Sequence, residues 1–90
     1  MRFEWDPRKA GENLRKHGVS FDEASSVFED PLGITYPDPD QSDDEQRLVT
    51  FGYSSSSRLL VVSNTERDDT LSIINARPAT RSEQKIYEEG

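Results

Sequence analysis

Cysteine is absent from this 90-residue chain, histidine occurs once, and only 31% of the residues are apolar. Without cysteine the fold contains no disulfide and no thiolate metal site, and a single histidine excludes metal clusters built on several histidines. No apolar run is long enough to cross a bilayer, and the sequence shows no signal-peptide pattern. We therefore expect a cytoplasmic protein without membrane contact, folded as one domain over residues 1–90 around a small core.

Acidic residues outnumber basic ones, and the formal net charge at pH 7 is -7. Many of them cluster in one polar stretch, at Asp38, Asp40, Asp43, Asp44 and Glu45. Phosphate contacts need Lys and Arg, so this balance is compatible with either a local basic surface on an acidic protein or a basic protein partner. The stretch lacks the glycine and the spacing of an EF-hand, which leaves a solvated loop or a docking site for a partner's arginines.

Start and stop signals define a first helix over residues 7–17. Asp6 can accept a hydrogen bond from the first turn, and Pro7 fits that turn because its N–H groups have no helical partner. Gly18 supplies the left-handed residue that ends the helix. Helical spacing predicts one face formed by Ala10, Leu14 and His17 and another formed by Lys9, Asn13 and Lys16.

Two capping boxes predict two further helices. Ser20 and Glu23 have S-x-x-E spacing and precede a helix expected over residues 21–29. Thr80 and Glu83 have the same spacing, and they open a short C-terminal helix that runs through residue 87. The sequence therefore predicts two helices near the beginning of the chain and one at its end.

Alternating apolar residues predict five strands between and around these helices. The expected strands are residues 2–5, 32–36, 46–54, 58–66 and 70–77. Leu59-Leu60-Val61-Val62 is apolar on both faces, which is typical of a central strand. Strands joined by tight turns favour an antiparallel meander, so we predict an α+β fold of order β-α-α-β-β-β-β-α. The helices should pack on one face of the small antiparallel sheet.

Short motifs spread along nearly the whole chain carry a family resemblance. In the first third they are Phe3-Glu4-Trp5-Asp6, Lys9, Asn13, Lys16-His17-Gly18-Val19-Ser20-Phe21 and Glu23-Ala24. In the middle they are Asp38-Pro39-Asp40, Ser42, Glu45, Arg47 and Gly52. Toward the end they are Arg58-Leu59-Leu60-Val61-Val62, Thr65-Glu66-Arg67, Ile73-Ile74, Ala76-Arg77, Ala79-Thr80, Glu83 and Tyr87. Together these residues resemble the BrnT toxin family, which is similar in fold to the RelE ribonuclease toxins.

The resemblance implies the toxin component of a bacterial type II toxin–antitoxin system. Such a toxin would cleave RNA without a metal or other cofactor and thereby inhibit translation. Its partner would be a BrnA-like antitoxin, a DNA-binding protein that neutralises the toxin and represses the shared operon. Family complexes pair two toxins with two antitoxins, so contact with DNA would be indirect, through the antitoxin.

Metal-free RNA cleavage needs a base for the ribose 2′-OH, an acid for the leaving 5′-oxygen, and cations beside the phosphoryl oxygens. Arg suits the last task because its planar fork can bind two phosphate oxygens at once. With the family resemblance, the candidates are Arg77 at the end of the last strand, Arg67 in a turn and Arg58 at the start of the central strand. Each could instead be a surface ion pair or a solvated charge.

His17 and Glu83 are the candidate base or acid. The unperturbed pKa of His permits proton exchange near neutral pH, although its place on an apolar stripe at a helix end favours packing or capping for His17. Glu83 can act beside Arg77 or complete the capping box with Thr80. Four further residues are candidates for RNA binding, and each also has a plain role at a helix terminus or on a helix face: Lys9, Lys16, Arg81 and Tyr87.

The chain departs from the family pattern at several positions. Members often carry His at the position of Gln41, His or an aromatic residue near Asn64, and Arg at the position of Ser72. Here Pro78 follows Arg77, where the family commonly continues with a second arginine. These differences sustain an alternative function: a module that binds the antitoxin without cleaving RNA.

Overall fold

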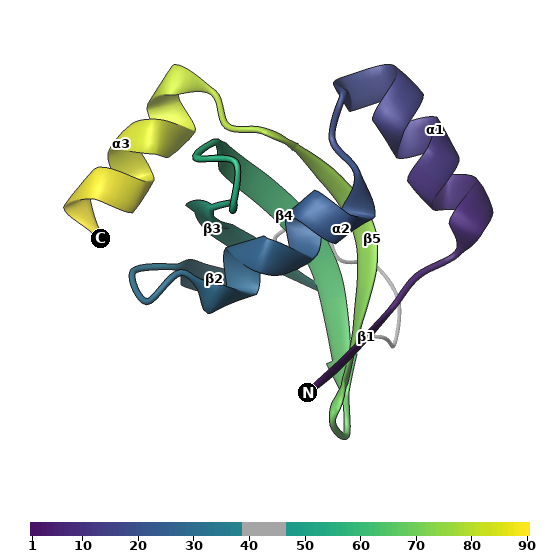
Figure 1. The fold of residues 1–90 in the computed structure, drawn as a ribbon. Coiled ribbons are helices and arrows are strands. Elements are labelled where there is room, and N and C mark those ends of the chain that lie inside the picture. Colours follow the sequence, from purple (N-terminus) through teal and green to yellow (C-terminus); the bar gives the residue numbers. More distant parts are fainter. Residues whose placement is uncertain (39–46) are drawn as a thin grey trace.

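A computed structural model describes residues 1–38 and 47–90 (Figure 1). The acidic stretch from residue 39 onward, together with Gln41, lies outside the described residues. The elements in chain order are β1 (Arg2–Glu4), α1 (Pro7–His17), α2 (Phe21–Ser26), the 3₁₀ helix η1 (Val27–Glu29), β2 (Ile34–Pro37), β3 (Arg47–Tyr53), β4 (Leu59–Arg67), β5 (Thr70–Pro78) and α3 (Arg81–Glu89). The predicted α+β class and element order are confirmed. In the described ranges, no helix is long and apolar enough to span a bilayer.

The sheet has the strand order β1-β5-β4-β3-β2, and the strands from β2 to β5 pair antiparallel as predicted. The apolar strand β4 occupies the predicted central position. One detail differs from the meander: β1 joins the edge of β5 in parallel, with Phe3 opposite Leu71. The sheet is therefore mixed. Local sequence patterns predict where a strand forms but not which strand it pairs with. They therefore could not predict this pairing, whose partners are 68 residues apart in the sequence.

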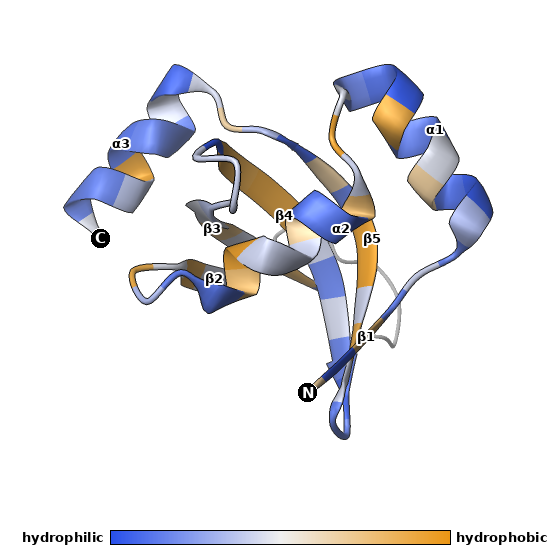
Figure 2. Ribbon diagram, in the orientation of Figure 1, coloured by the Kyte–Doolittle hydropathy of each residue, from blue (hydrophilic) through white to orange (hydrophobic). Residues whose placement is uncertain are grey.

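Helices α1 and α2 cover one face of the sheet, where the apolar core lies. Figure 2 shows the apolar part of β4 facing α2. The core residues are Val19, Phe21, Ala24, Val27, Leu60, Val62, Leu71, Ile73 and Ala76. Gly52 lets η1 approach β3, because a Cβ there would lie 2.8 Å from a methyl carbon of Val27. This face is filled by packed side chains, so any open site must lie elsewhere.

The caps form largely as predicted. The Asp6 side chain accepts a hydrogen bond from the N–H of residue 8, and Gly18 ends α1 at φ 69°. Ser20 caps α2, but the helix ends at Ser26 rather than at residue 29, where η1 replaces it. The expected second half of this capping box is missing, since the carboxylate of Glu23 binds Arg58 and Ser54 instead.

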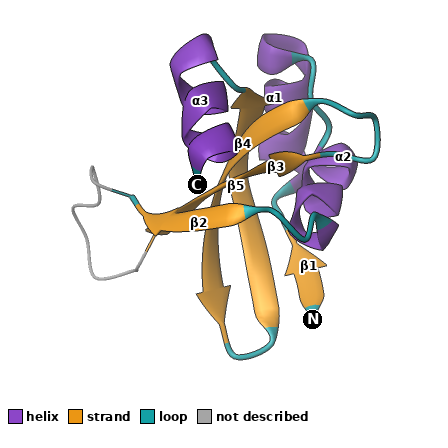
Figure 3. Ribbon diagram, turned by 90° about the vertical axis from the view of Figure 1, so that its left-hand side faces the viewer, coloured by secondary structure: helices purple, strands orange, loops and turns teal. Residues whose placement is uncertain are grey.

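Helix α3 lies on the opposite side of the sheet from α2 (Figure 3). The expectation that the helices share one face therefore holds for α1 and α2 and not for α3. The complete capping box of Thr80 and Glu83 is confirmed, and α3 has no buried residue. Instead, the Tyr87 hydroxyl donates a 2.7 Å hydrogen bond to Asp30, and its ring lies 5.3 Å from that of Tyr53. Polar and aromatic contacts thus hold α3 beside the open face.

Asn13 is buried, although helical spacing groups it with Lys9 and Lys16. Its side-chain amide donates to the carbonyl oxygens of Val19 (3.0 Å) and Ala76 (2.7 Å). Its side-chain oxygen accepts from the N–H of Ala76 (3.1 Å). Because β1 pairs only with residues 70–72 of β5, this part of the β5 edge has no neighbouring strand. Asn13 supplies the hydrogen bonds that such a strand would have made.

Candidate active site

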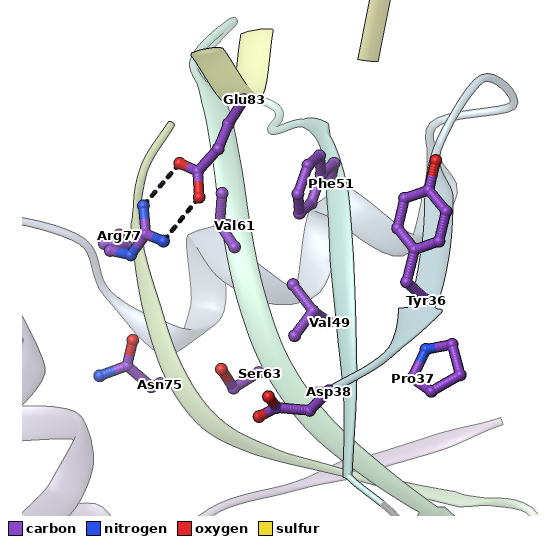
Figure 4. A pocket seen from close by; sticks show the side chains of 10 residues that line it. All are labelled: Tyr36, Pro37, Asp38, Val49, Phe51, Val61, Ser63, Asn75, Arg77 and Glu83. Carbon is purple, nitrogen blue, oxygen red and sulfur yellow. Dashed lines mark hydrogen bonds and ion pairs between the residues drawn. The ribbon is translucent and has the colours of Figure 1, made fainter. Parts of the chain in front are cut away.

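A cleft of about 590 Å³ lies on the face of the sheet that α1 and α2 leave open (Figure 4). Antiparallel register aligns its residues in two rows across the strands. One row is Ile34, Phe51, Val61 and Arg77, and the neighbouring row is Tyr36, Val49, Ser63 and Asn75. All of these except Ile34 line the cleft, together with Pro37, Asp38 and Glu83. The cleft therefore has an apolar floor and polar groups along its rim.

A β-bulge in β5 turns Arg77 toward the cleft. The register shifts between Ser63 and Asn64 of β4, which leaves Ile74 of β5 without a partner on that strand. Side chains alternate along a regular strand, so Arg77 would otherwise share the face of Ile73, which is buried beneath the helices. The extra residue reverses this alternation. Bulges often re-aim side chains beside active sites, and here the bulge moves a guanidinium from the core face to the open face.

Arg77 and Glu83 form a two-pronged ion pair at one end of the cleft (Figure 4). Both Nη atoms of Arg77 donate to the carboxylate oxygens of Glu83, at 2.7 Å each. Hydrogen bonding to Arg77 lowers the pKa of Glu83 to about 2, with a smaller contribution from the N–H of Thr80. The same carboxylate therefore caps α3 and holds Arg77. The capping role of Glu83 predicted from the sequence is confirmed, and its role as a base beside Arg77 stays a prediction.

Arg58 lies on the other face of the sheet. Its guanidinium binds Glu23 of α2, at 2.6 Å and 2.9 Å, and the carbonyl oxygen of Gly18 at 3.0 Å. The hydrogen bond from Arg58 lowers the pKa of Glu23. These contacts connect β4 to both covering helices, and they assign Arg58 a structural position away from the cleft.

Arg67 lies at the β4–β5 hairpin, where it borders a separate small hollow with Glu4 and Ser72. Its partner Thr70 lies seven positions before Arg77 on β5, a span of roughly 23 Å in an extended strand. The structure therefore does not bring Arg58, Arg67 and Arg77 together. Of the three arginines, it places only Arg77 in the cleft.

The lysines of α1 lie next to the cleft. Lys9 and Lys16 border a hollow of about 210 Å³ beside β5, and this hollow shares Asn75 with the cleft. His17 is the half-buried last residue of α1 and does not line the cleft. Arg81 is exposed on the first turn of α3.

Tyr87 anchors α3 outside the cleft. Its hydroxyl is engaged by the Asp30 carboxylate, and this hydrogen bond raises the pKa of Tyr87 to about 12. A phenol with that pKa keeps its proton near neutral pH. The described contacts of Tyr87 are those of a residue that fixes the helix. No group of three metal-ligating side chains is found within residues 1–38 and 47–90.

Comparisons with known proteins decide the family. The family described as the ribonuclease toxin BrnT of type II toxin–antitoxin systems matches residues 5–83. The chain belongs to the BrnT family. No curated protein matches the sequence. The crystal structure of the Brucella abortus ribonuclease toxin BrnT matches with a TM-score of 0.69 at 23% identity, covering 90% of this chain and 99% of that one. At this identity the structural match shows the common fold.

Several cleft residues of this BrnT-family chain were not singled out from the sequence. Tyr36, Ser63 and Asn75 reach the cleft because their strands alternate and pair in one register. A signal for them exists in the apolar spacing of the last strand, since Ile73 and Ala76 are three residues apart and both are buried. An odd spacing between two core positions of one strand indicates a bulge.

The Arg77–Glu83 pair predicts a pH-dependent contribution to stability. The pKa of Glu83 in the folded protein, about 2, lies below its ordinary value of 4.5, so the stabilisation is complete above pH 4.5 and decreases as the pH falls toward 2. Glu83→Gln keeps a capping acceptor but loses the charge, and we expect it to lower the free energy of unfolding by about 1–2 kcal/mol at pH 7. Urea unfolding at pH 7 and pH 2.5 measures this difference, which should be much smaller at the lower pH.

The matched control is Glu89→Gln, at the exposed end of the same helix. A negative charge is unfavourable there, so this variant should match or slightly exceed the wild-type stability at pH 7. Equal losses for both variants would contradict the assigned ion pair.

Proposed function

We propose that this chain is a metal-independent ribonuclease that inhibits translation, with the open-face cleft as its active site. The observation that carries the proposal is the guanidinium of Arg77, which a β-bulge directs into a cleft of a BrnT-family chain. A planar guanidinium can hold two oxygens of one phosphate, and it can stabilise the charge that gathers on them during cleavage.

Substrate binding would exchange one anion for another at Arg77. A phosphodiester that enters the cleft competes with Glu83 for the same Nη donors. Once displaced from Arg77, the Glu83 carboxylate loses the hydrogen bonds that lower its pKa most and becomes a stronger base. Glu83 is then suited to take the proton of the ribose 2′-OH while the 2′-oxygen attacks phosphorus, the bond from phosphorus to the 5′-oxygen breaks, and the leaving 5′-oxygen takes a proton from water. Lys9 and Lys16, beside Asn75, can contact neighbouring phosphates.

We propose a BrnA-like antitoxin as the protein partner, in a complex of two toxins with two antitoxins in the bacterial cytoplasm. The net charge of -7 favours a basic partner. The family membership supports a protein antitoxin, since type II systems are defined by one. In this arrangement the toxin would meet DNA only through its partner.

The ion pair at Arg77 also favours a second candidate, a module that binds the antitoxin without cleaving RNA. The cleft cation is already neutralised by Glu83, and the family arginine expected at the position of Ser72 is absent. Such a protein would keep the fold and the surface that binds the antitoxin, but its cleft would not bind phosphate. The two candidates differ in RNA turnover and not in partner binding.

One experiment separates the two candidates. Purified protein should cleave a labelled RNA in the presence of EDTA, and expression should arrest growth until the antitoxin gene is co-expressed. Glu83→Ala tests the exchange at Arg77, because it removes the competing carboxylate and the base together and should lower the cleavage rate by about 10²-fold. Intact RNA, normal growth and tight antitoxin binding would support the non-catalytic module instead.

A further inference from the structure

Tyr36 is an exposed aromatic residue at the wall of the cleft. It lies on the edge strand β2, opposite Val49 of β3, and 43% of its surface is exposed. Its ring contacts that of Phe51 edge-on, with centroids 6.0 Å apart and an angle of 72°. The helix-covered core does not include it. A large aromatic side chain that is left open inside a concave site is available to a ligand.

The cleft combines a flat apolar floor with hydrogen-bonding groups at its rim. Val49, Phe51 and Val61 form the floor, while Ser63 and Asn75 stand beside them in the neighbouring positions (Figure 4). Its volume of about 590 Å³ falls within the range of small-molecule sites. A nucleobase is a flat ring with apolar faces and a polar edge, so it matches both parts of this lining.

We propose that the cleft holds one unstacked nucleobase of single-stranded RNA against Tyr36, with an adjoining phosphate on Arg77. This inference rests on the proposed ribonuclease function and names its substrate as unpaired RNA. Proteins read single-stranded RNA by stacking splayed bases on aromatic side chains. Tyr36 and Arg77 occupy the outer strands of the cleft, which lie about 14 Å apart at the usual strand spacing, and because the two residues are in neighbouring rows they are separated by roughly 16 Å. Both side chains are long, and a nucleoside with its phosphate can bridge the gap that remains.

Paired RNA does not satisfy this geometry. In a duplex each base is stacked and hydrogen-bonded, so neither its face nor its polar edge can reach the cleft floor. For a base in a loop or single strand, the free-energy cost of unstacking from its neighbours is small. Tyr36 therefore selects for unpaired RNA, whereas Arg77 contacts the backbone and carries no sequence information.

The test uses a fluorescent single-stranded oligonucleotide with 2′-O-methyl riboses, which binds but lacks the 2′-OH nucleophile. Tyr36→Ala should weaken its binding by about 5–150-fold, the equivalent of about 1–3 kcal/mol for one stacked base. Tyr36→Phe keeps the ring and should bind within about twofold of wild type. The control is Phe3→Ala, a half-exposed aromatic of β1 that pairs opposite the core residue Leu71. It should bind as wild type does.

A series of oligonucleotides with one abasic position each identifies the stacked base. For one abasic position, wild-type protein should bind the probe as weakly as Tyr36→Ala binds the intact probe. Tyr36→Ala should then bind that abasic probe no more weakly than wild type does. Melting temperatures of both Tyr36 variants show that binding is compared between folded proteins. If Tyr36→Ala binds the intact probe as tightly as wild type does, the inference is wrong. It is also wrong if Tyr36→Ala weakens the binding of every abasic probe as much as it weakens the binding of the intact probe.

Separate measurements distinguish this inference from the proposed function. Wild-type protein that cleaves ordinary RNA while Tyr36→Ala binds the probe normally would refute the base site alone. Wild-type protein that cleaves no RNA but binds the probe through Tyr36 would refute catalysis and support the base site. If Tyr36→Ala weakens antitoxin binding and leaves probe binding unchanged, the occupant is an antitoxin side chain and the inference fails.

Discussion

Replacing Arg77 with alanine is expected to lower the rate of RNA cleavage by about 10²–10³-fold while the protein stays folded. Arg77 is the cation that the structure places in the cleft among the three arginines predicted from the sequence. Its two Nη donors, which now hold Glu83, would otherwise stabilise the extra charge on the phosphoryl oxygens. Single-turnover cleavage of a labelled RNA measures the loss, and thermal unfolding confirms that the variant is folded.

Two further variants determine whether the fork or the charge of Arg77 matters. Arg77→Lys keeps a positive charge but cannot hold two oxygens in one plane, so about tenfold of the rate should be lost. Arg8→Ala removes an equal charge from the exposed first turn of α1 and should leave the rate unchanged. If Arg77→Ala cleaves as fast as Arg8→Ala, the cleft is not the active site.

Local signals in the sequence were sufficient for the helices. Asp6 and Gly18 mark the two ends of α1, which runs over the predicted residues. Thr80 and Glu83 predict the start of α3 equally well, because both halves of their capping box form. Caps are contacts between residues a few positions apart, so the surrounding fold seldom alters them. The box at Ser20 is the exception, since its acidic partner Glu23 binds Arg58 from a distant strand.

Such local signals do not predict the pairing of strands that are far apart in the sequence. The parallel pairing of β1 with β5 joins residues 68 positions apart, and no turn between them indicates it. The bulge at Ile74, which decides which face Arg77 occupies, leaves one local signal, the odd spacing of the buried residues Ile73 and Ala76. The sequence predicts that Arg77 lies at the end of the last strand, and the structure places it at one end of the cleft. Its role in catalysis stays a prediction.

The wider set of candidate arginines shows why residue type alone does not define a site. Arg58 and Arg77 are both half-exposed and both hold a carboxylate, yet they lie on opposite faces of the sheet. Arg58 ties β4 to α2 through Glu23, whereas Arg77 ties β5 to α3 through Glu83. Only the second pair borders a cleft. The difference comes from strand register and helix placement, which composition and spacing do not report.

Replacing Asn13 with leucine is expected to lower the free energy of unfolding by about 3–5 kcal/mol, a large share of the total stability of a domain of this size. Leucine has nearly the same volume but leaves three buried backbone groups without partners, in Val19 and Ala76. Each unpaired buried group costs about 1–3 kcal/mol, and neighbouring losses overlap. Urea unfolding followed by circular dichroism measures the change.

Asn13→Asp tests whether Asn13 stabilises the fold through its hydrogen-bond donors or through its shape. A buried carboxylate cannot donate to the carbonyl oxygens of Val19 and Ala76, and burial raises the pKa of such a group above its unfolded value. Its protonated form can donate one hydrogen bond, so the stability of Asn13→Asp should increase as the pH falls through that raised pKa. Glu12→Ala, on the neighbouring exposed position, should change the stability by less than about 0.5 kcal/mol. If Asn13→Leu is as stable as Glu12→Ala, the edge of β5 does not depend on α1, and the alignment of the cleft residues on that strand must have another source.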